Sequence, residues 1–181
     1  MTQEETDMNR VCNIIEHLAR YRMAMDITNK KPTAAFAESF AVRIEANETL
    51  LGPGEQISLQ YKSPIKITME NFGSTALYFY LYNLGPCWRV KGMLNATYET
   101  IPGHRKSSRK IQMTVPPVMS EHGSCEDVIK VFVTSEPTSF DSLELPNLDE
   151  LDKTSGARVG RPNSNGPEDW VALNFPIHTF I

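Results

Sequence analysis

The chain has 181 residues, of which 40% are hydrophobic and 22% charged, enough to bury one sizeable core in a single globular unit with extensions. Its net charge of -4 argues against nucleic acid or an anionic membrane as the main partner, because both attract a basic surface. No apolar stretch reaches the roughly 18 to 20 residues that cross a bilayer, and the acidic start MTQEETDMNR is unlike a signal peptide, so we expect a cytoplasmic protein.

The first predicted element is an amphipathic helix over residues 5–27. Its apolar positions recur at helical spacing, at Val11, Ile14, Ile15, Leu18 and Met25. Such a stripe packs either on the chain's own sheet or on a partner, and the sequence does not choose between them. In the second case Ile14 and Leu18 are the expected partner contacts. Pro32 follows the helix and ends it.

Residues 65–90 are predicted to form the centre of the fold. Residues 36–45 and 56–61 show the alternation of strands before them. Alternation over 65–69 and an apolar run over 76–83 predict two strands folded back on each other across a turn at 71–74. The second strand places leucines and a phenylalanine on one face and three tyrosines on the other, so we expect it to be central and covered on both faces: Leu77, Phe79, Leu81 against Tyr78, Tyr80, Tyr82.

A basic segment over residues 104–110 follows the short strands predicted at 88–90 and 98–101. Its cations are Arg105, Lys106, Arg109 and Lys110, with His104 in front of them. We expect a loop. A basic cluster of this kind binds an acidic peptide or a phosphate in some proteins, and in more of them it is a solvated hairpin tip.

The C-terminal third is predicted to contain two further interior strands separated by a long loop. Residues 111–115 alternate, and the β-branched run over 128–134 is typical of an interior strand. Residues 139–145 are long enough for one helical turn. Residues 148–168 contain almost no large apolar side chains, which predicts a flexible loop. Residues 170–180 alternate again and are expected to return to the sheet.

About eight short strands behind one helix predict a mainly β protein. The expected fold is an antiparallel β-sandwich, Ig-like or jelly-roll-like, with one N-terminal amphipathic helix. The expected parts are an N-terminal helix and linker (1–33), the sandwich (34–147), a flexible loop (148–168) and a returning strand (169–181). No Gly-rich phosphate-binding motif and no βαβ rhythm are present.

The cysteines and histidines give little indication of catalysis. Cys12, Cys87 and Cys125 are widely spaced, which predicts reduced thiols and neither a disulfide framework nor a metal motif. Cys125 follows His122 by three residues and is the best candidate nucleophile, but the acidic residues after it raise a thiol pKa. We therefore predict no cofactor, no metal and no enzymatic activity.

Three runs of sequence resemble a known family. They are TALYFYLYNLGPCWRV, TVPPVMSEHGSCEDVIKVFVTSEPTSFDSLELPNL and EDWVALNFPIHTF. Together they resemble the β-rich region that follows the peptidase domain in fungal caspase-like, metacaspase-type proteins, and the likeness spans residues 18–180. The catalytic histidine and cysteine motifs of the caspase-like fold are missing, so no catalytic residue is carried over.

The resemblance implies a non-catalytic accessory domain. The expected function is protein interaction, with a protein partner or a caspase-like peptidase domain bound through the helix, a sheet edge or the basic segment. The alternative is a cysteine hydrolase, or a fragment of a caspase-like peptidase. A third hypothesis is a barrel that holds a ligand against Tyr78, Tyr80 and Tyr82. The sequence does not specify the oligomeric state.

Overall fold

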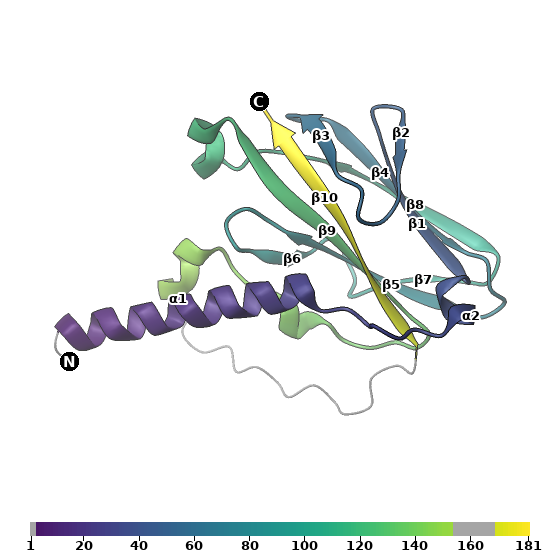
Figure 1. The fold of residues 1–181 in the computed structure, drawn as a ribbon, viewed down its shortest axis with the longest axis horizontal. Helices are drawn as coiled ribbons and strands as arrows, with labels where there is room; N and C mark the ends of the chain where they lie inside the picture. Colours follow the sequence, from purple (N-terminus) through teal and green to yellow (C-terminus); the bar gives the residue numbers. More distant parts are fainter. Residues whose placement is uncertain (1–2, 154–168) are drawn as a thin grey trace.

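The computed structural model describes residues 3–153 and 169–181, which form a β-sandwich with one long N-terminal helix (Figure 1). One sheet has four strands in the order β2-β1-β4-β8, and the other has six, in the order β3-β10-β9-β5-β6 with β7 also paired to β5. The strands of the first sheet are β1 (Phe40–Ala46), β2 (Thr49–Leu51), β4 (Pro64–Asn71) and β8 (Arg105–Gln112). Those of the second are β3 (Ile57–Gln60), β5 (Leu77–Leu84), β6 (Val90–Gly92), β7 (Glu99–Ile101), β9 (Ser124–Thr134) and β10 (Trp170–Phe180).

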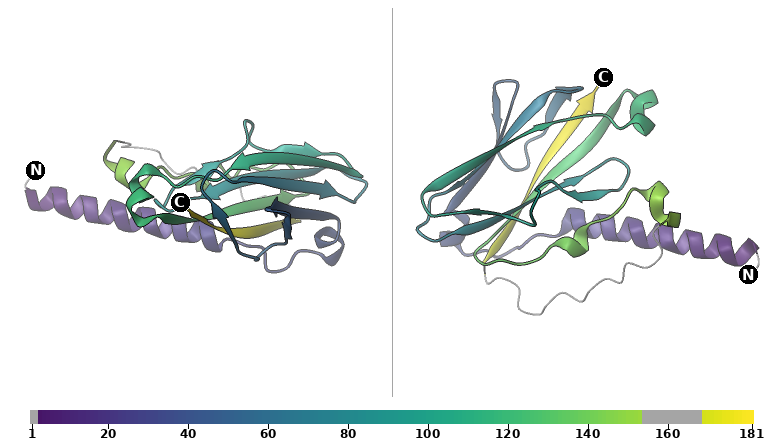
Figure 2. Two further views of the ribbon diagram at one scale, coloured as in Figure 1. Left: turned by 90° about the horizontal axis from the view of Figure 1, so that it is seen from above. Right: turned by 180° about the vertical axis from the view of Figure 1, so that it is seen from behind.

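Short helical elements complete the chain around the long helix α1 (Gln3–Asp26). They are α2 (Ala34–Ala37) and three 3-10 helices, η1 (Pro117–His122), η2 (Asp141–Leu143) and η3 (Leu148–Lys153). Figure 2 shows the two sheets edge-on and α1 extending beyond them at its N-terminal end. The prediction of a mainly β sandwich behind one N-terminal helix is therefore confirmed.

The main core lies between the two sheets. Strands β1 and β4 direct every second side chain inward, as in Ile44 and Ile67, and β5, β9 and β10 meet them with Phe79, Val131 and Phe175. Each of these five side chains is almost completely buried. The period-two burial of β4 and the alternating apolar residues of its sequence are the same pattern, because successive strand residues point to opposite faces.

A second apolar layer covers the outer face of the six-stranded sheet. Tyr80 and Tyr82 of β5 and Phe132 of β9 are buried there against Ala24 of α1 and Leu143 of η2. Strand β5 is thus covered on both faces, as its sequence predicts.

The tyrosines of β5 pack and make hydrogen bonds in this layer. Tyr80 donates a hydrogen bond from its hydroxyl to Thr138 O (3.1 Å) and contacts the ring of Phe140 edge-on, with ring centroids 4.9 Å apart. Tyr78 contacts Tyr98 in the same way at 5.3 Å. This packing does not favour the ligand-holding barrel, because the rings fill the space that a ligand would need.

The predicted central hairpin is wrong. Strand β4 pairs with β1 and β8 in one sheet, whereas β5 pairs with β6, β7 and β9 in the other. The turn at residues 71–74 carries the chain from one sheet to the other. Asn71 fixes this crossover, because its side-chain amide donates to Thr75 O and to Ile101 O, both at 2.8 Å.

Two segments that the sequence predicts as loops contain regular structure. The basic segment is an extended strand, β8, and the first six residues of the predicted loop 148–168 form η3. The remainder of that loop, from residue 154, lies outside the described residues.

Strand β10 returns to the sandwich between β9 and β3, and its pairing with β3 is parallel, while the other strand pairs of the described chain are antiparallel.

Candidate functional site

The C-terminal half of α1 is attached to the outer face of the six-stranded sheet. His17 Nε2 lies 2.8 Å from Trp88 O, and the Tyr21 hydroxyl donates to Gly85 O at 3.2 Å. The side chain of His17 is 3% exposed, and its hydrogen bond to the backbone offsets the cost of burying a polar imidazole. These contacts join the helix to the loop between β5 and β6.

Lys130 joins the same half of α1 to the middle of the sheet. Its Nζ donates to Met25 O at 2.8 Å and lies 5.5 Å from the ring centroid of Phe132. The ammonium group is almost completely buried. Burial lowers the pKa of Lys130 to about 8, and the carboxylate of Asp26 opposes this shift. A cation at a helix C-terminus is favourable for the helix dipole, so Lys130 acts as a cap supplied by the sheet.

The N-terminal half of α1 extends past the sandwich (Figure 1), and several of its apolar side chains are exposed to solvent. Met8, Val11 and Ile15 are 65%, 50% and 61% exposed. At 100° per residue these three positions fall within an arc of about 60°, on the side opposite His17. By the same spacing, the partner contacts predicted from the sequence, Ile14 and Leu18, adjoin this arc on one edge, and they are half-buried. We name Met8, Val11 and Ile15 the free stripe.

The four cations predicted as partner contacts lie together on β8, the last strand of the four-stranded sheet. Arg105, Lys106, Arg109 and Lys110 are exposed. Arg109 Nε donates to Glu99 Oε2 at 2.9 Å, and the hydroxyl of Ser107 donates to the same carboxylate. In the described residues, Arg105, Lys106 and Lys110 form no side-chain hydrogen bond or ion pair.

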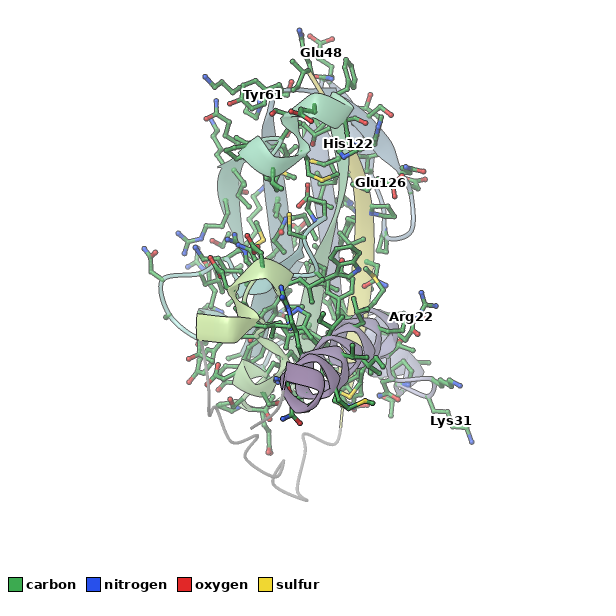
Figure 3. All side chains as sticks on the ribbon, turned by 90° about the vertical axis from the view of Figure 1, so that its left-hand side faces the viewer. Arg22, Lys31, Glu48, Tyr61, His122 and Glu126 are labelled. Atoms are coloured by element: carbon green, nitrogen blue, oxygen red, sulfur yellow. The ribbon has the colours of Figure 1, made fainter. Side chains whose placement is uncertain are left out.

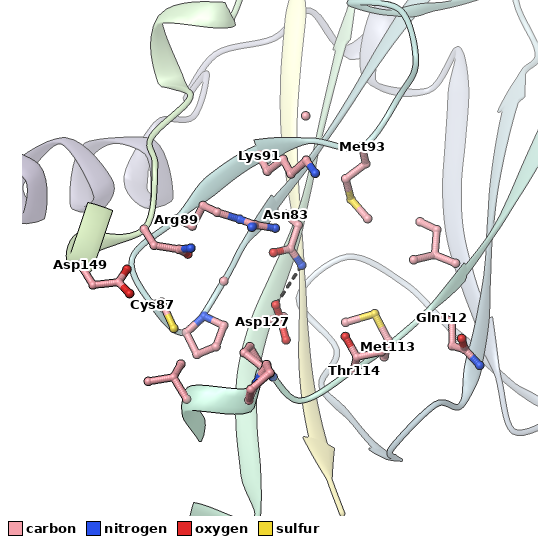
Figure 4. Close-up of a pocket in the computed structure, with 18 of the residues that line it drawn as sticks. Asn83, Cys87, Arg89, Lys91, Met93, Gln112, Met113, Thr114, Asp127 and Asp149 are labelled. Atoms are coloured by element: carbon pink, nitrogen blue, oxygen red, sulfur yellow. Dashed lines mark hydrogen bonds between the residues drawn. The ribbon is translucent and has the colours of Figure 1, made fainter. Parts of the chain in front are cut away.

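A groove of about 700 Å³ lies where the edges of the two sheets diverge (Figure 4). Arg89 and Lys91 extend from one wall toward Asn83, and Met113 lies on the wall beyond β8. In the interior, Asn83 Nδ2 donates to Asp127 Oδ1 at 2.9 Å. Asp127 is 7% exposed, and burial raises the pKa of its carboxyl group, which the bond from Asn83 opposes.

The buried carboxylate of the groove, Asp127, has neutral hydrogen-bond partners. Asp127 is hydrogen-bonded to a neutral amide and to the thiol of Cys125, whose Sγ lies 3.6 Å from its Oδ2. General acid–base chemistry in hydrolases commonly uses two groups whose pKa values are set apart across a substrate. The polar groups in the interior of this groove instead satisfy one another.

Cys125 does not have the surroundings of a nucleophile. Its side chain is buried, and its Sγ also lies 3.9 Å from Thr114 O. Burial and the nearby Asp127 charge raise the pKa of the thiol to about 12, so the thiolate is scarce near neutral pH. His122 lies beside Glu126 (Figure 3) and lines one pocket with Cys125, but the described structure has no hydrogen bond between His122 and Cys125.

Metal-binding clusters and membrane-spanning helices are absent from the part of the chain that the structure describes. Residues 3–153 and 169–181 contain no group of three or more His, Cys, Asp or Glu side chains that is placed to hold a metal ion. None of the described helices has the length and apolarity needed to cross a bilayer.

Comparison with known proteins gives structural neighbours of low similarity. No family model and no curated protein matches the chain. A β-glucosidase from Listeria innocua in complex with isofagomine is similar over 76% of this chain and 16% of the enzyme, at 13% identity and a TM-score of 0.26. A mutant of this enzyme in complex with laminaribiose gives 12% identity and a TM-score of 0.25 over the same shares. The chain spans about one sixth of the length of these enzymes, and TM-scores of this size support no statement about its function.

Proposed function

We propose that this chain is a non-catalytic protein-interaction domain that docks through the N-terminal half of α1. The observation that carries the proposal is the free stripe, an apolar surface on a helix whose other end is anchored. Exposed apolar side chains scattered singly are ordinary, whereas three on one face of a projecting helix form a continuous surface. Their spacing of three and four residues is the pattern by which a helix binds in an apolar groove.

The anchoring of α1 lowers the entropic cost of docking a partner on the free stripe. His17, Tyr21 and the Lys130 cap fix the direction of the helix, so a partner does not have to order the helix from a disordered segment. Burying side chains such as Val11 and Ile15 contributes about 1.5 to 3 kcal/mol each.

The partner that we propose is a caspase-like peptidase domain. The support for it is the sequence resemblance over residues 18–180 to the region that follows such a domain. The alternative of a cysteine hydrolase has no support from the buried, high-pKa thiol of Cys125.

The experiment replaces Val11 and Ile15 together by aspartate. Binding to a purified caspase-like peptidase domain of the resembled family, measured by isothermal titration calorimetry, is expected to weaken at least about tenfold, because two charges would have to be desolvated in an apolar groove. Circular dichroism should show an unchanged fold, since both side chains are already in solvent.

The matched control replaces Asn9 and Asn13 by aspartate. These exposed residues lie on the same two turns of α1 and outside the free stripe, so this double variant adds the same charge without touching the proposed contact. It should bind like the parent chain. Equal binding by all three proteins, or no binding by the parent, would overturn the proposal.

A further inference from the structure

Strand β8 has an unpaired edge in the described structure, and the residues that direct their backbone N–H and C=O groups toward this edge can be identified. Within residues 3–153 and 169–181 it pairs with β4 on one side only and ends the sheet. Met113 N donates to Ser63 O at 3.1 Å just beyond the paired region. Because antiparallel strands bond through alternate residues, this contact fixes which residues of β8 bond to β4. The residues that direct their N–H and C=O groups to the free edge are Lys106, Ser108 and Lys110.

The same three residues present their side chains on the outer face of the sheet. Ser108 Oγ lies 3.1 Å from Thr68 Oγ1 of β4 on that face. Lys110 is opposite Lys66 in the register, and Lys66 is already paired with Glu45 at 3.0 Å. Lys106 is opposite Glu70, whose carboxylate lies 4.0 Å from Arg43 and forms no ion pair with Lys106 in the described structure. The edge therefore keeps unpaired positive charge, although the whole chain has a net charge of -4.

The charges select among possible occupants of this edge. A second copy of β8 added antiparallel about Ser108 would place Lys106 opposite Lys110 at both ends of the pairing. Like charges directly opposite each other destabilise a strand pair, and edge lysines are a known protection against self-association. Opposite charges at those positions stabilise it.

We propose that β8 binds an extended acidic segment of a partner protein, which adds as a further antiparallel strand to the four-stranded sheet. The outward N–H and C=O groups of Lys106, Ser108 and Lys110 supply the backbone hydrogen bonds. The ammonium groups of Lys106 and Lys110 select carboxylates at alternate positions of the segment. This second docking surface is independent of the free stripe, because β8 belongs to the sheet that α1 does not cover (Figure 1).

The test uses a fluorescein-labelled peptide in which glutamate and valine alternate, with a lysine–valine peptide for comparison. Fluorescence anisotropy at low salt should show saturable binding of the acidic peptide to the parent chain. The double variant Lys106→Glu/Lys110→Glu should bind it at least about tenfold more weakly and should bind the lysine peptide instead.

A proline at the centre of the edge separates strand addition from diffuse attraction of charges. Ser108→Pro removes one outward N–H and keeps every charge, and edge strands tolerate proline where the N–H faces solvent. This variant should also lose about tenfold in affinity, while Ser108→Ala should bind like the parent. Full binding by a folded Ser108→Pro variant, or no saturable binding by the parent, would overturn the proposal. The Val11→Asp/Ile15→Asp variant should bind the peptide normally, so a failure of the α1 proposal would be distinguishable from a failure here.

Discussion

Replacing Phe132 by alanine is expected to lower the free energy of unfolding by about 3 to 5 kcal/mol, as for other fully buried phenylalanines. Phe132 is 0% exposed and lies at the centre of the outer apolar layer. Its ring stacks on Phe140 with centroids 4.1 Å apart and meets Tyr82 edge-on at 6.0 Å. Alanine would leave a cavity between the sheet and the segment that covers it, and the surrounding rings could close it only in part.

Urea denaturation followed by tryptophan fluorescence measures this loss. Phe72→Ala is the matched control, because Phe72 is 45% exposed at the turn between the sheets, and substitutions at such positions usually change stability by no more than about 0.5 kcal/mol. A loss below about 1 kcal/mol for Phe132→Ala would mean that the outer layer contributes little to the fold.

Replacing Lys130 by methionine is expected to change how stability depends on pH. The pKa of Lys130 is about 8 in the folded chain, against an ordinary value of 10.5. Between these two pH values the unfolded state binds more protons than the folded state, so the stability of the parent rises with pH. The methionine variant lacks this group. The parent should therefore gain roughly 2 to 4 kcal/mol relative to the variant from pH 8 to pH 10.5.

The comparison of the two proteins removes the contributions of other groups. Burial raises the pKa of Tyr21 to about 12, so ionisation of Tyr21 destabilises both proteins at high pH by the same amount. Near pH 7 the methionine variant should be at least as stable as the parent, because an apolar side chain often replaces a buried charge without loss. Lys110→Met controls for the loss of one charge at an exposed position. A stability difference between parent and Lys130→Met that stays constant with pH would contradict the burial of the ammonium group.

The sequence predicts the strands better than it predicts the sheets. The alternation in β5 and the β-branched run in β9 indicate strands buried on both faces, and the structure has both at the centre of one sheet. The predicted hairpin failed because local alternation does not specify which strands pair. Strand β4 matches β1 and β8 in register, and the Asn71 crossover that separates β4 from β5 depends on a contact with Ile101, 30 residues away.

The two candidate docking surfaces could also be predicted only in part from the sequence. The helical spacing correctly predicts α1 and one apolar stripe along it, but only the packing of the helix against the loop at Trp88 and Gly85 decides which part of that stripe is covered. The sequence therefore predicts Ile14 and Leu18 as partner contacts, whereas the structure exposes Val11 and Ile15. The basic residues of β8 predict a loop because such a cluster is most often a solvated hairpin tip, whereas an exposed edge strand also accommodates them.

Amide hydrogen exchange along α1 in the isolated chain is the most direct test, because the proposed docking requires one anchored half and one free half of this helix. Amides over residues 18–26 should exchange at least about a hundredfold more slowly than those over residues 8–15, since the contacts of His17, Tyr21 and Lys130 hold only the second half of the helix. Equal exchange rates along the whole helix, whether slow or fast, would contradict the division of α1 into an anchor and a docking surface.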